Sequence, residues 1–416
     1  MNLNIKKSVA AAVVLMGLAP SAFAGGVQID NKSLTDVLIE KGVLTKEEAK
    51  QVAKNEDGKL KLEALFYLNT YSQKADTTTA AGTTSTKTAG LVVDRAYFTA
   101  KYNFNDDWMM RLTTDMGTDG ALSKSQNIYL KYAYLEGKLA GDAAVLRVGQ
   151  SHTPWIDYEQ DLWKYRYVAK TMIDTYGFDS SADLGVGLKG KLLDGKVGYF
   201  VTETTGRGYG NRTTNAGGAT TGSTNGLDFD ARVGVYPIDG LTLDVQYRNG
   251  YKGTKTNIAS VTNSGIKSTL LQGMVTYGSE KDWRIGLNYV ANKDKGNTAV
   301  FGSGAHGGNV ISGLTTAAVN DEVNSRGTAV WAWGKIPGTS FGGLARYENM
   351  TNQLTTGGVK GTKEKLTRYV AGLEYNVIKG VDFSLVYDRT KLTNRGAVAA
   401  NARKDTRFGV YSQVKF

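Results

Sequence analysis

The C-terminal twelve residues carry the pattern that most constrains the fold, an alternation of mainly apolar and mainly polar positions. This stretch reads DTRFGVYSQVKF and runs to the end of the 416-residue chain. One parity is mainly apolar and includes Phe408, Val410, Val414 and Phe416. The other parity includes Arg407, Gln413 and Lys415. Because side chains in a strand alternate between two faces, this stretch predicts a β-strand with one apolar and one polar face.

The same alternation recurs from Leu60 onward and predicts about sixteen strands. We place them at 60–72, 91–104, 108–117, 126–138, 144–151, 183–193, 196–204, 226–236, 241–250, 267–278, 282–292, 324–335, 340–350, 364–376, 381–392 and 405–416. Long connections are expected at 73–90, 118–125, 152–182, 205–225, 251–266, 293–323, 351–363 and 393–404. They alternate with short links. Short turns at one end and long loops at the other are typical of a membrane-spanning up-and-down barrel.

The absence of a spanning helix supports the same fold. No apolar run after the N-terminus is long enough to cross a bilayer as a helix. In lipid every backbone N–H and C=O needs a partner, and only a closed barrel leaves no strand edge. We therefore predict an all-β fold, a closed antiparallel transmembrane β-barrel spanning 60–416. Barrels of about 16–18 strands enclose an aqueous lumen, so the strand number predicts a pore.

Residues 1–24 predict the compartment. Lys6 and Lys7 precede an apolar run, and Ala22-Phe23-Ala24 has the small-x-small pattern of a cleavage site. This arrangement is typical of a secretory signal peptide, with cleavage after Ala24. The predicted location is the bacterial outer membrane, with lipid and lipopolysaccharide around the barrel and the N-terminus in the periplasm.

Residues 25–59 are predicted to form a short periplasmic lead-in with helical character. Ser33 and Thr45 are placed as N-caps, and Glu48 follows Thr45 at capping-box spacing. Gly42 separates the two apolar stripes, so we expect two short helices. A role in docking a partner is the alternative to a simple lead-in.

The connection 152–182 differs from the other loops, which are rich in Thr, Gly, Ser and Asn. It reads HTPWIDYEQDLWKYRYVAKTMIDTYGFDSSA. A long aromatic loop is costly in water, so we expect it to fold against the protein. We predict a constriction loop inside the lumen; an outer lid and an oligomer contact are the alternatives. The candidate constriction residues are Trp155, Asp157, Glu159, Asp161, Lys164, Arg166 and Lys170.

Three segments carry a resemblance to known porins. RVGQSHTPW (147–155), followed by SADLGVGLKG (181–190), resembles the phosphate-selective porin O/P family, and LIEKGVLTKEEA (38–49) is similar to the helical lead-in of some porins of this kind. The matching stretches cover about a fifth of the chain. The resemblance implies a sixteen-stranded barrel, a homotrimer and passage of small anions. The family's phosphate-contacting residues do not map one by one onto this chain.

The polar strand faces carry more bases than acids, which predicts a lumen that prefers anions. The pore-lining candidates are Arg95, Arg111, Lys131, Arg147, Arg232, Arg248, Arg284, Arg346 and Arg368. Among them, Arg111, Arg147, Arg232 and Arg284 are the preferred candidates. The alternative is that these arginines pair with acids such as Asp115, Asp228, Asp244, Glu348 and Asp388 across the lumen wall, which leaves little net selectivity.

Other functions find less support in the residues. Cysteine is absent and there are only two histidines, so thiolate, metal and histidine chemistry have little material. Ser151 and His152 are adjacent on a strand and point to opposite faces, which does not suit a nucleophile and its base. We therefore expect no enzyme activity, no cofactor and no nucleic-acid partner. A barrel that sheaths a periplasmic or cytochrome partner remains the alternative to a porin.

Overall fold

A computed structural model describes residues 59–118, 126–206, 208–209, 227–252, 256–258, 261–263, 266–296, 321–394 and 401–416. The chain divides into two units, Met1–Lys61 and Leu62–Phe416, and the second is the β-barrel. The predicted signal peptide and helical lead-in lie outside the described residues. Among the residues described, no helix is long and apolar enough to cross a membrane.

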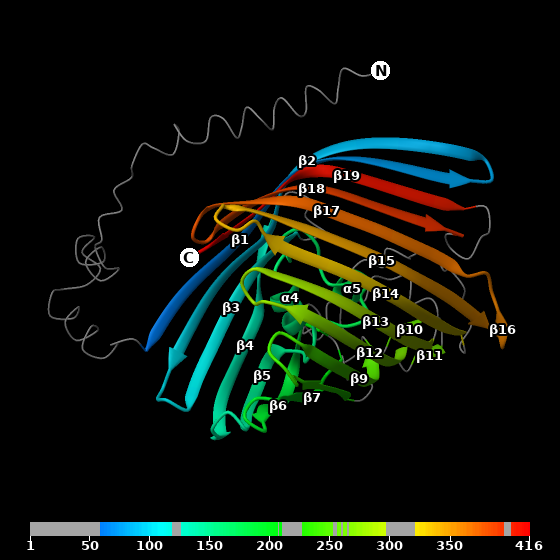
Figure 1. The fold of residues 1–416 in the computed structure, drawn as a ribbon. Helices are drawn as coiled ribbons and strands as arrows, with labels where there is room; N and C mark the ends of the chain where they lie inside the picture. Colours follow the sequence, from blue (N-terminus) through cyan, green and yellow to red (C-terminus); the bar gives the residue numbers. More distant parts are fainter. Residues whose placement is uncertain are drawn as a thin grey trace. The chain divides into compact units, whose positions relative to one another are not determined.

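The wall of the barrel is one antiparallel sheet in which strands that follow each other in the chain pair with each other (Figure 1). Its strands are β1 (Leu60–Thr79), β2 (Gly82–Asn103), β3 (Trp108–Thr118), β4 (Gln126–Ala140), β5 (Ala144–His152), β6 (Ala182–Leu192), β7 (Val197–Thr204), β8 (Asp228–Val235), β9 (Thr242–Lys252), β12 (Ile266–Gly278), β13 (Trp283–Gly296), β14 (Asp321–Lys335), β15 (Phe341–Thr356), β16 (Val359–Lys360), β17 (Glu364–Ile378), β18 (Val381–Thr393) and β19 (Ala402–Lys415). The sheet has seventeen strands, and because β16 is a two-residue piece beside β15, sixteen strands make the wall.

The sheet closes where the last strand pairs with the first. β19 lies antiparallel to β1 from Leu65↔Lys415 to Thr78↔Ala402. Beyond the ladder, the Ala64 N–H donates to the Phe416 carbonyl at 2.8 Å, and the Phe416 N–H donates back to Ala64 at 3.1 Å. The terminal strand therefore seals the barrel, as its alternating pattern predicted.

Strand placement is confirmed, but several strands are longer than predicted. The connection expected at 73–90 is wrong, because β1 continues to Thr79 and β2 begins at Gly82. The Thr-rich sequence there hid a continuing hairpin, since β-branched threonines suit extended backbone. The connection expected at 351–363 is likewise shortened by the ends of β15 and by β16, and that at 251–266 contains the small hairpin β10 (Thr256–Ile258) and β11 (Val261–Asn263).

The two faces of the wall are reversed relative to a soluble protein. Outward positions are apolar and exposed, as at Ile285, Leu287 and Val330, each 50–52% accessible. Inward positions are polar and buried, as at Arg232 and Asp244. Aromatic rings gather at two levels on the outside. Near the short turns the rings of Tyr277 and Trp283 lie 5.7 Å apart, and farther along the strands those of Tyr347 and Tyr369 lie 4.9 Å apart. This distribution matches the lipid-facing band and aromatic girdles of a membrane barrel.

A β-bulge changes the face of the sheet to which one predicted pore residue points. Thr113 pairs with Tyr132 and Thr114 pairs with Leu130, so Lys131 is the extra residue of β4. Lys131 and Tyr132 are consequently both buried, although neighbours on a regular strand point to opposite faces. The lumen-facing placement of Lys131 thus depends on the bulge.

We expect the seam between β1 and β19 to be sensitive to a single methyl group. A Cβ at Gly409 would lie 2.7 Å from the Tyr71 Cα and would collide with the Thr70 carbonyl oxygen, because the two backbones approach closely there. Gly409→Ala should therefore destabilise the barrel by about 1–3 kcal/mol. The measurement is the temperature at which the folded, fast-migrating form on gels is lost.

Gly343→Ala is the matched control, because a Cβ there meets its nearest atom only at 3.9 Å, the Gly372 carbonyl oxygen. Equal transition temperatures for the two variants would contradict the proposed steric role of the seam.

Candidate functional site

The segment between β5 and β6 lies inside the barrel (Figure 1). It forms α4 (Ile156–Trp163) and α5 (Met172–Thr175). Its side chains reach inward-facing residues on several strands. The Tyr158 hydroxyl donates to Asp244 of β9 at 2.9 Å, and Tyr176 donates to Glu348 of β15 at 2.6 Å. Because these acceptors are on different parts of the lumen wall, the segment crosses the interior of the barrel.

Local sequence explains how α4 begins and ends. Asp157 and Glu159 lie in its first turn, where the helix macrodipole favours negative charge. The helix stops at Lys164, which adopts a left-handed backbone conformation with φ of 63°. The chain changes direction at this residue. The Lys164 ammonium donates to the backbone carbonyl of Glu280, which lies in the short turn between β12 and β13.

An aromatic cluster holds the inserted segment against β14. Trp163 is fully buried, and its ring lies 5.6 Å from Trp331 and 5.6 Å from Tyr165. Its indole N–H donates to the Ala169 carbonyl at 3.0 Å. From the wall, the Trp333 indole N–H donates to the Leu162 carbonyl at 2.9 Å. Aromatic pairs in edge or tilted geometry add about 0.5–1.5 kcal/mol each beyond area burial.

A chain of alternating charges ties α4 to three strands. Glu159 Oε1 lies 3.9 Å from the Arg346 guanidinium, which lies 2.6 Å from Glu348. Glu348 in turn lies 3.9 Å from Arg368, which binds Asp388 at 2.7 Å. Burial raises the pKa of Glu159, and Arg346 acts against that rise. Buried charges need such partners. Arg346 lies between Glu159 of the inserted segment and Glu348 of the wall, and Arg368 has wall partners, Glu348 and Asp388.

A second arginine holds the entry of the segment. The Arg232 Nε donates to the Pro154 carbonyl at 2.9 Å, and its Nη1 lies 2.7 Å from Asp244. Its guanidinium also lies 3.7 Å from the centre of the Tyr158 ring, a cation–π geometry. Arg232 therefore contacts both the wall and the loop.

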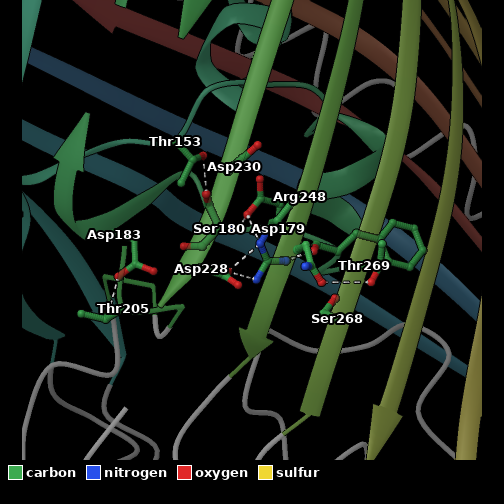
Figure 2. Close-up of polar contacts among 12 residues, drawn as sticks. Thr153, Asp179, Ser180, Asp183, Thr205, Asp228, Asp230, Arg248, Ser268 and Thr269 are labelled. Carbon is green, nitrogen blue, oxygen red and sulfur yellow. Dashed lines mark hydrogen bonds and ion pairs between the residues drawn. The ribbon is translucent and has the colours of Figure 1, made fainter. Parts of the chain in front are cut away.

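A third arginine holds the exit of the segment (Figure 2). Arg248 donates from Nε to Asp228 at 2.7 Å and from Nη1 to the Phe178 carbonyl at 3.0 Å. Close by, the Thr153 hydroxyl donates to the Ser180 carbonyl at 2.6 Å, so the two ends of the loop bind each other. The predicted pore residue Arg248 is thus part of the loop's attachment.

The remaining candidates lie on β2, β3, β4, β5 and β13. Arg95 is 3.8 Å from Asp115, and Arg147 is 2.6 Å from Glu136. Within the described ranges, the other three bind no carboxylate. Arg111 Nη1 lies 3.1 Å from His152 Nε2, Lys131 donates to the Ser181 hydroxyl, and Arg284 donates to the Thr276 hydroxyl at 2.8 Å.

The predicted constriction residues divide into two groups. Trp155, Glu159 and Arg166 are buried, and they pack or pair inside the protein. Asp161, Lys164 and Lys170 are exposed, and Asp157 is half-buried, bound to His152 and Tyr132. Only the second group keeps substantial solvent-accessible surface.

The sequence analysis did not predict the wall residues against which the inserted segment packs. Trp331 and Trp333 occupy the inward parity of β14, whose other inward members include Ser325, Gly327 and Ala329. Two indoles on a face that is otherwise small are a recognisable signal for a packing surface inside a barrel. It also did not predict that the hydroxyl groups of Tyr158, Tyr165 and Tyr176 donate hydrogen bonds to carboxylates of the wall.

Comparison with known proteins places the fold. No known family matches the chain, and no curated protein is similar to it in sequence. The outer membrane channel DcaP of Acinetobacter baumannii superposes with a TM-score of 0.57 at 11% identity, covering 86% of this chain and 98% of that one. The anion-selective porin from Comamonas acidovorans gives 0.53 at 10% identity, with coverage of 86% and 99%. The trimer form of Vibrio cholerae OmpT gives 0.52 at 14%, with coverage of 86% and 99%. These similarities establish the barrel fold.

We expect Trp163 to determine whether the inserted segment stays in place. Trp163→Ala removes a fully buried indole, a change that costs about 3–5 kcal/mol when the site does not collapse. Faster hydrogen exchange across 155–178 is the expected result, while the barrel strands keep their protection. Trp283→Ala, on the lipid-facing side, is the control and should leave the exchange of the segment unchanged.

Proposed function

We propose that this protein is an outer-membrane porin, a water-filled channel for passive diffusion of small hydrophilic solutes. The observation that carries the proposal is the reversed barrel, apolar outside and charged inside, with a lumen partly filled by the 153–181 segment. An apolar exterior suits lipid, and a charged interior suits water and hydrophilic solutes. The inserted segment then acts as a constriction loop that sets the size limit.

Hydrated charges mark the open side of the lumen. The Lys189 side chain keeps 31% of its accessibility and the Lys101 side chain 29%, although both face inward. Glu136 lies between Arg147 and Lys189, at 2.6 and 3.0 Å. In contrast, the inward residues of β14 and β15 are covered by the loop. The conduction path of the proposed pore therefore follows β2 to β6.

The proposed pore prefers anions weakly. Arg95, Arg147, Arg232, Arg248, Arg346 and Arg368 each have an acid partner, which reduces the excess positive charge. Arg111 carries the excess on the open side, since it pairs with no described carboxylate. Lys131 adds little to it, because its side chain is fully buried beside Ser181. Passage of phosphate-like oxyanions, a homotrimeric assembly and a periplasmic N-terminus belong to the same proposal; a similar solved structure is named as an anion-selective porin and another as a trimer.

The geometry gives less support to the two competing functions, a barrel that sheaths a partner and a hydrolase. A barrel that sheaths a partner needs a lumen wide enough to admit it, and here the aromatic cluster around Trp163 occupies part of that space. For a hydrolase, His152 would have to activate Ser151, yet its ring nitrogens meet Asp157 and Arg111. The Ser151 hydroxyl instead points to the backbone oxygen of His152.

Deleting residues 155–167 should raise single-channel conductance and weaken discrimination between solutes of different size. The reason is that the segment occupies lumen cross-section that water and ions would otherwise fill. The measurement is conductance in planar bilayers, with heat-modifiable gel migration to show that the variant is folded. A folded deletion variant with wild-type conductance would place the segment outside the conduction path.

Two single-charge variants should shift ion selectivity in opposite directions. Glu136→Gln removes the acid beside Arg147 and Lys189, so anion preference should increase. Arg111→Gln removes a base without a carboxylate partner, so anion preference should decrease. Because water and salt screen a unit charge in the lumen, each shift in permeability ratio should be about twofold. Reversal potentials in a potassium chloride gradient give the sign; shifts in the same direction for both variants would contradict the proposed path.

A further inference from the structure

The outer surface of the barrel carries basic side chains just beyond its apolar band. Six of them, Lys267, Lys295, Arg326, Lys365, Arg389 and Lys391, define what we call the basic rim. They lie on the outward parity of β12, β13, β14, β17 and β18, near the strand ends that lead into the longer connections. All six are exposed, and in the part of the chain that the structure describes none forms an ion pair with a carboxylate. Lys295 lies opposite Glu322, whose ion pair is with Lys293 at 2.7 Å.

The rim follows directly after an aromatic girdle on the same face. On β18 the outward positions run Phe383, Leu385, Tyr387, Arg389 and Lys391. Adjacent outward positions on a strand are about 7 Å apart, so the first base lies one step beyond the aromatic ring. Tyr369 of β17 pairs in register with Arg389, which places the girdle and the rim side by side. Aromatic girdles sit at the level of lipid headgroups, so the bases beyond them meet the headgroup layer.

Like charges face each other along the rim. Lys267 pairs directly with Lys295 across β12 and β13, and Lys391 pairs with Lys404 across β18 and β19. Directly opposed like charges on one face of an antiparallel pair destabilise it. Lys404 also binds Asp76 at 3.2 Å, and Lys295 lies opposite Glu322 across β13 and β14, whereas Lys267 and Lys391 have no described acid partner. An anion held between such pairs would relieve the repulsion.

The neighbouring connections add bases and no acids. The sequences of 253–265, 297–320, 357–363 and 395–400 contain Lys255, Lys360, Lys363 and Arg395, and neither Asp nor Glu occurs in them. The connections that adjoin the rim strands in the sequence therefore carry basic side chains without acidic ones.

The opposite flank of the barrel lacks these bases. Across the described residues of β3 to β9, no outward position holds Lys or Arg. The exposed outward acid there is Glu203, near the end of β7. The basic rim is thus confined to one side of the wall, which a general requirement for solubility would not produce.

We propose that the basic rim is a docking surface for the phosphorylated headgroup of an outer-leaflet lipid, held by β12 to β18 and not by β3 to β9. The proposal rests on the proposed function, because only a membrane-spanning barrel presents this face to headgroups. Arg and Lys fit it chemically: guanidinium groups bind phosphate oxygens in pairs, and ammonium groups bind them as point charges. A headgroup with two phosphates can bridge bases on neighbouring strands. The apolar and aromatic residues below then contact its acyl chains.

The test compares lipid binding by the folded full-length barrel and two variants in nanodiscs. The rim variant is Lys365→Gln/Arg389→Gln/Lys391→Gln. The matched control is Lys138→Gln/Lys196→Gln/Lys281→Gln, three exposed lysines near the opposite, short-turn end. The ligands are lipid A with two phosphates and the same lipid after removal of its phosphates, with inorganic phosphate as competitor. Native mass spectrometry counts the bound lipid, and heat-modifiable migration confirms folding.

We expect the rim variant to bind phosphorylated lipid A about tenfold or more weakly, since each base near an anionic membrane surface contributes about fivefold. The control should bind as the wild type does, and dephosphorylated lipid should bind weakly to all three. Equal binding of phosphorylated lipid A by the rim variant and the wild type would overturn the proposal. Full displacement by inorganic phosphate at millimolar concentration would overturn it too, by making the site one for free anions.

A conductance measurement distinguishes failure of the lipid-docking proposal from failure of the porin proposal. The rim side chains lie outside the lumen, so the rim variant should conduct as the wild type does. Loss of lipid binding by the rim variant, with normal conductance, supports the proposal that the basic rim binds lipid. A wild-type barrel that binds lipid A but does not conduct would end the porin proposal alone.

Discussion

Closure of the sheet is the constraint on which the rest of the structure depends. Backbone N–H and C=O groups in a lipid-facing wall have no water to bind, so every strand needs a neighbour on both sides. The pairing of β19 with β1 meets this demand at the one place where the ends of the wall join. Once the ring is closed, alternate residues must face the lumen and the surroundings. The reversed distribution of polar and apolar side chains follows from that geometry.

A lumen lined by arginines poses a second problem, because charged groups that lose water need partners. The chain meets it with wall acids and with the inserted segment. Glu159 extends a row of alternating charges that runs through Arg346, Glu348 and Arg368 to Asp388. Arg232 and Arg248 hold the two ends of the segment through backbone carbonyls. The same residue type therefore fastens the loop on one side and leaves hydrated charge on the other.

Charge is divided between the inside and the outside of the wall by different rules. Inward bases are mostly balanced within the protein, as Arg147 is by Glu136. Outward bases such as Arg389 and Lys391 are not balanced by described acids, and they gather on one flank. A partner outside the chain is the natural complement of that excess. The wall can thus carry one arrangement of charge in its lumen and another on its exterior, because the two faces of each strand are independent.

The sequence by itself determined the strands, their faces and the closed barrel, because a two-residue period is a local property that any window of the chain displays. It also marked residues 152–182 as different and assigned Arg111, Arg232 and Arg346 to the inner face. It could not say which arginines are neutralised, since acid partners such as Asp244 for Arg232 depend on register between strands and on the path of the loop. Tertiary structure alone likewise decides two further features. One is the bulge that turns Lys131 inward, and the other is the packing of Trp163 against Trp331. Local alternation is written in neighbouring residues, whereas pairing across the lumen joins residues far apart in the chain, so only the folded barrel brings them together.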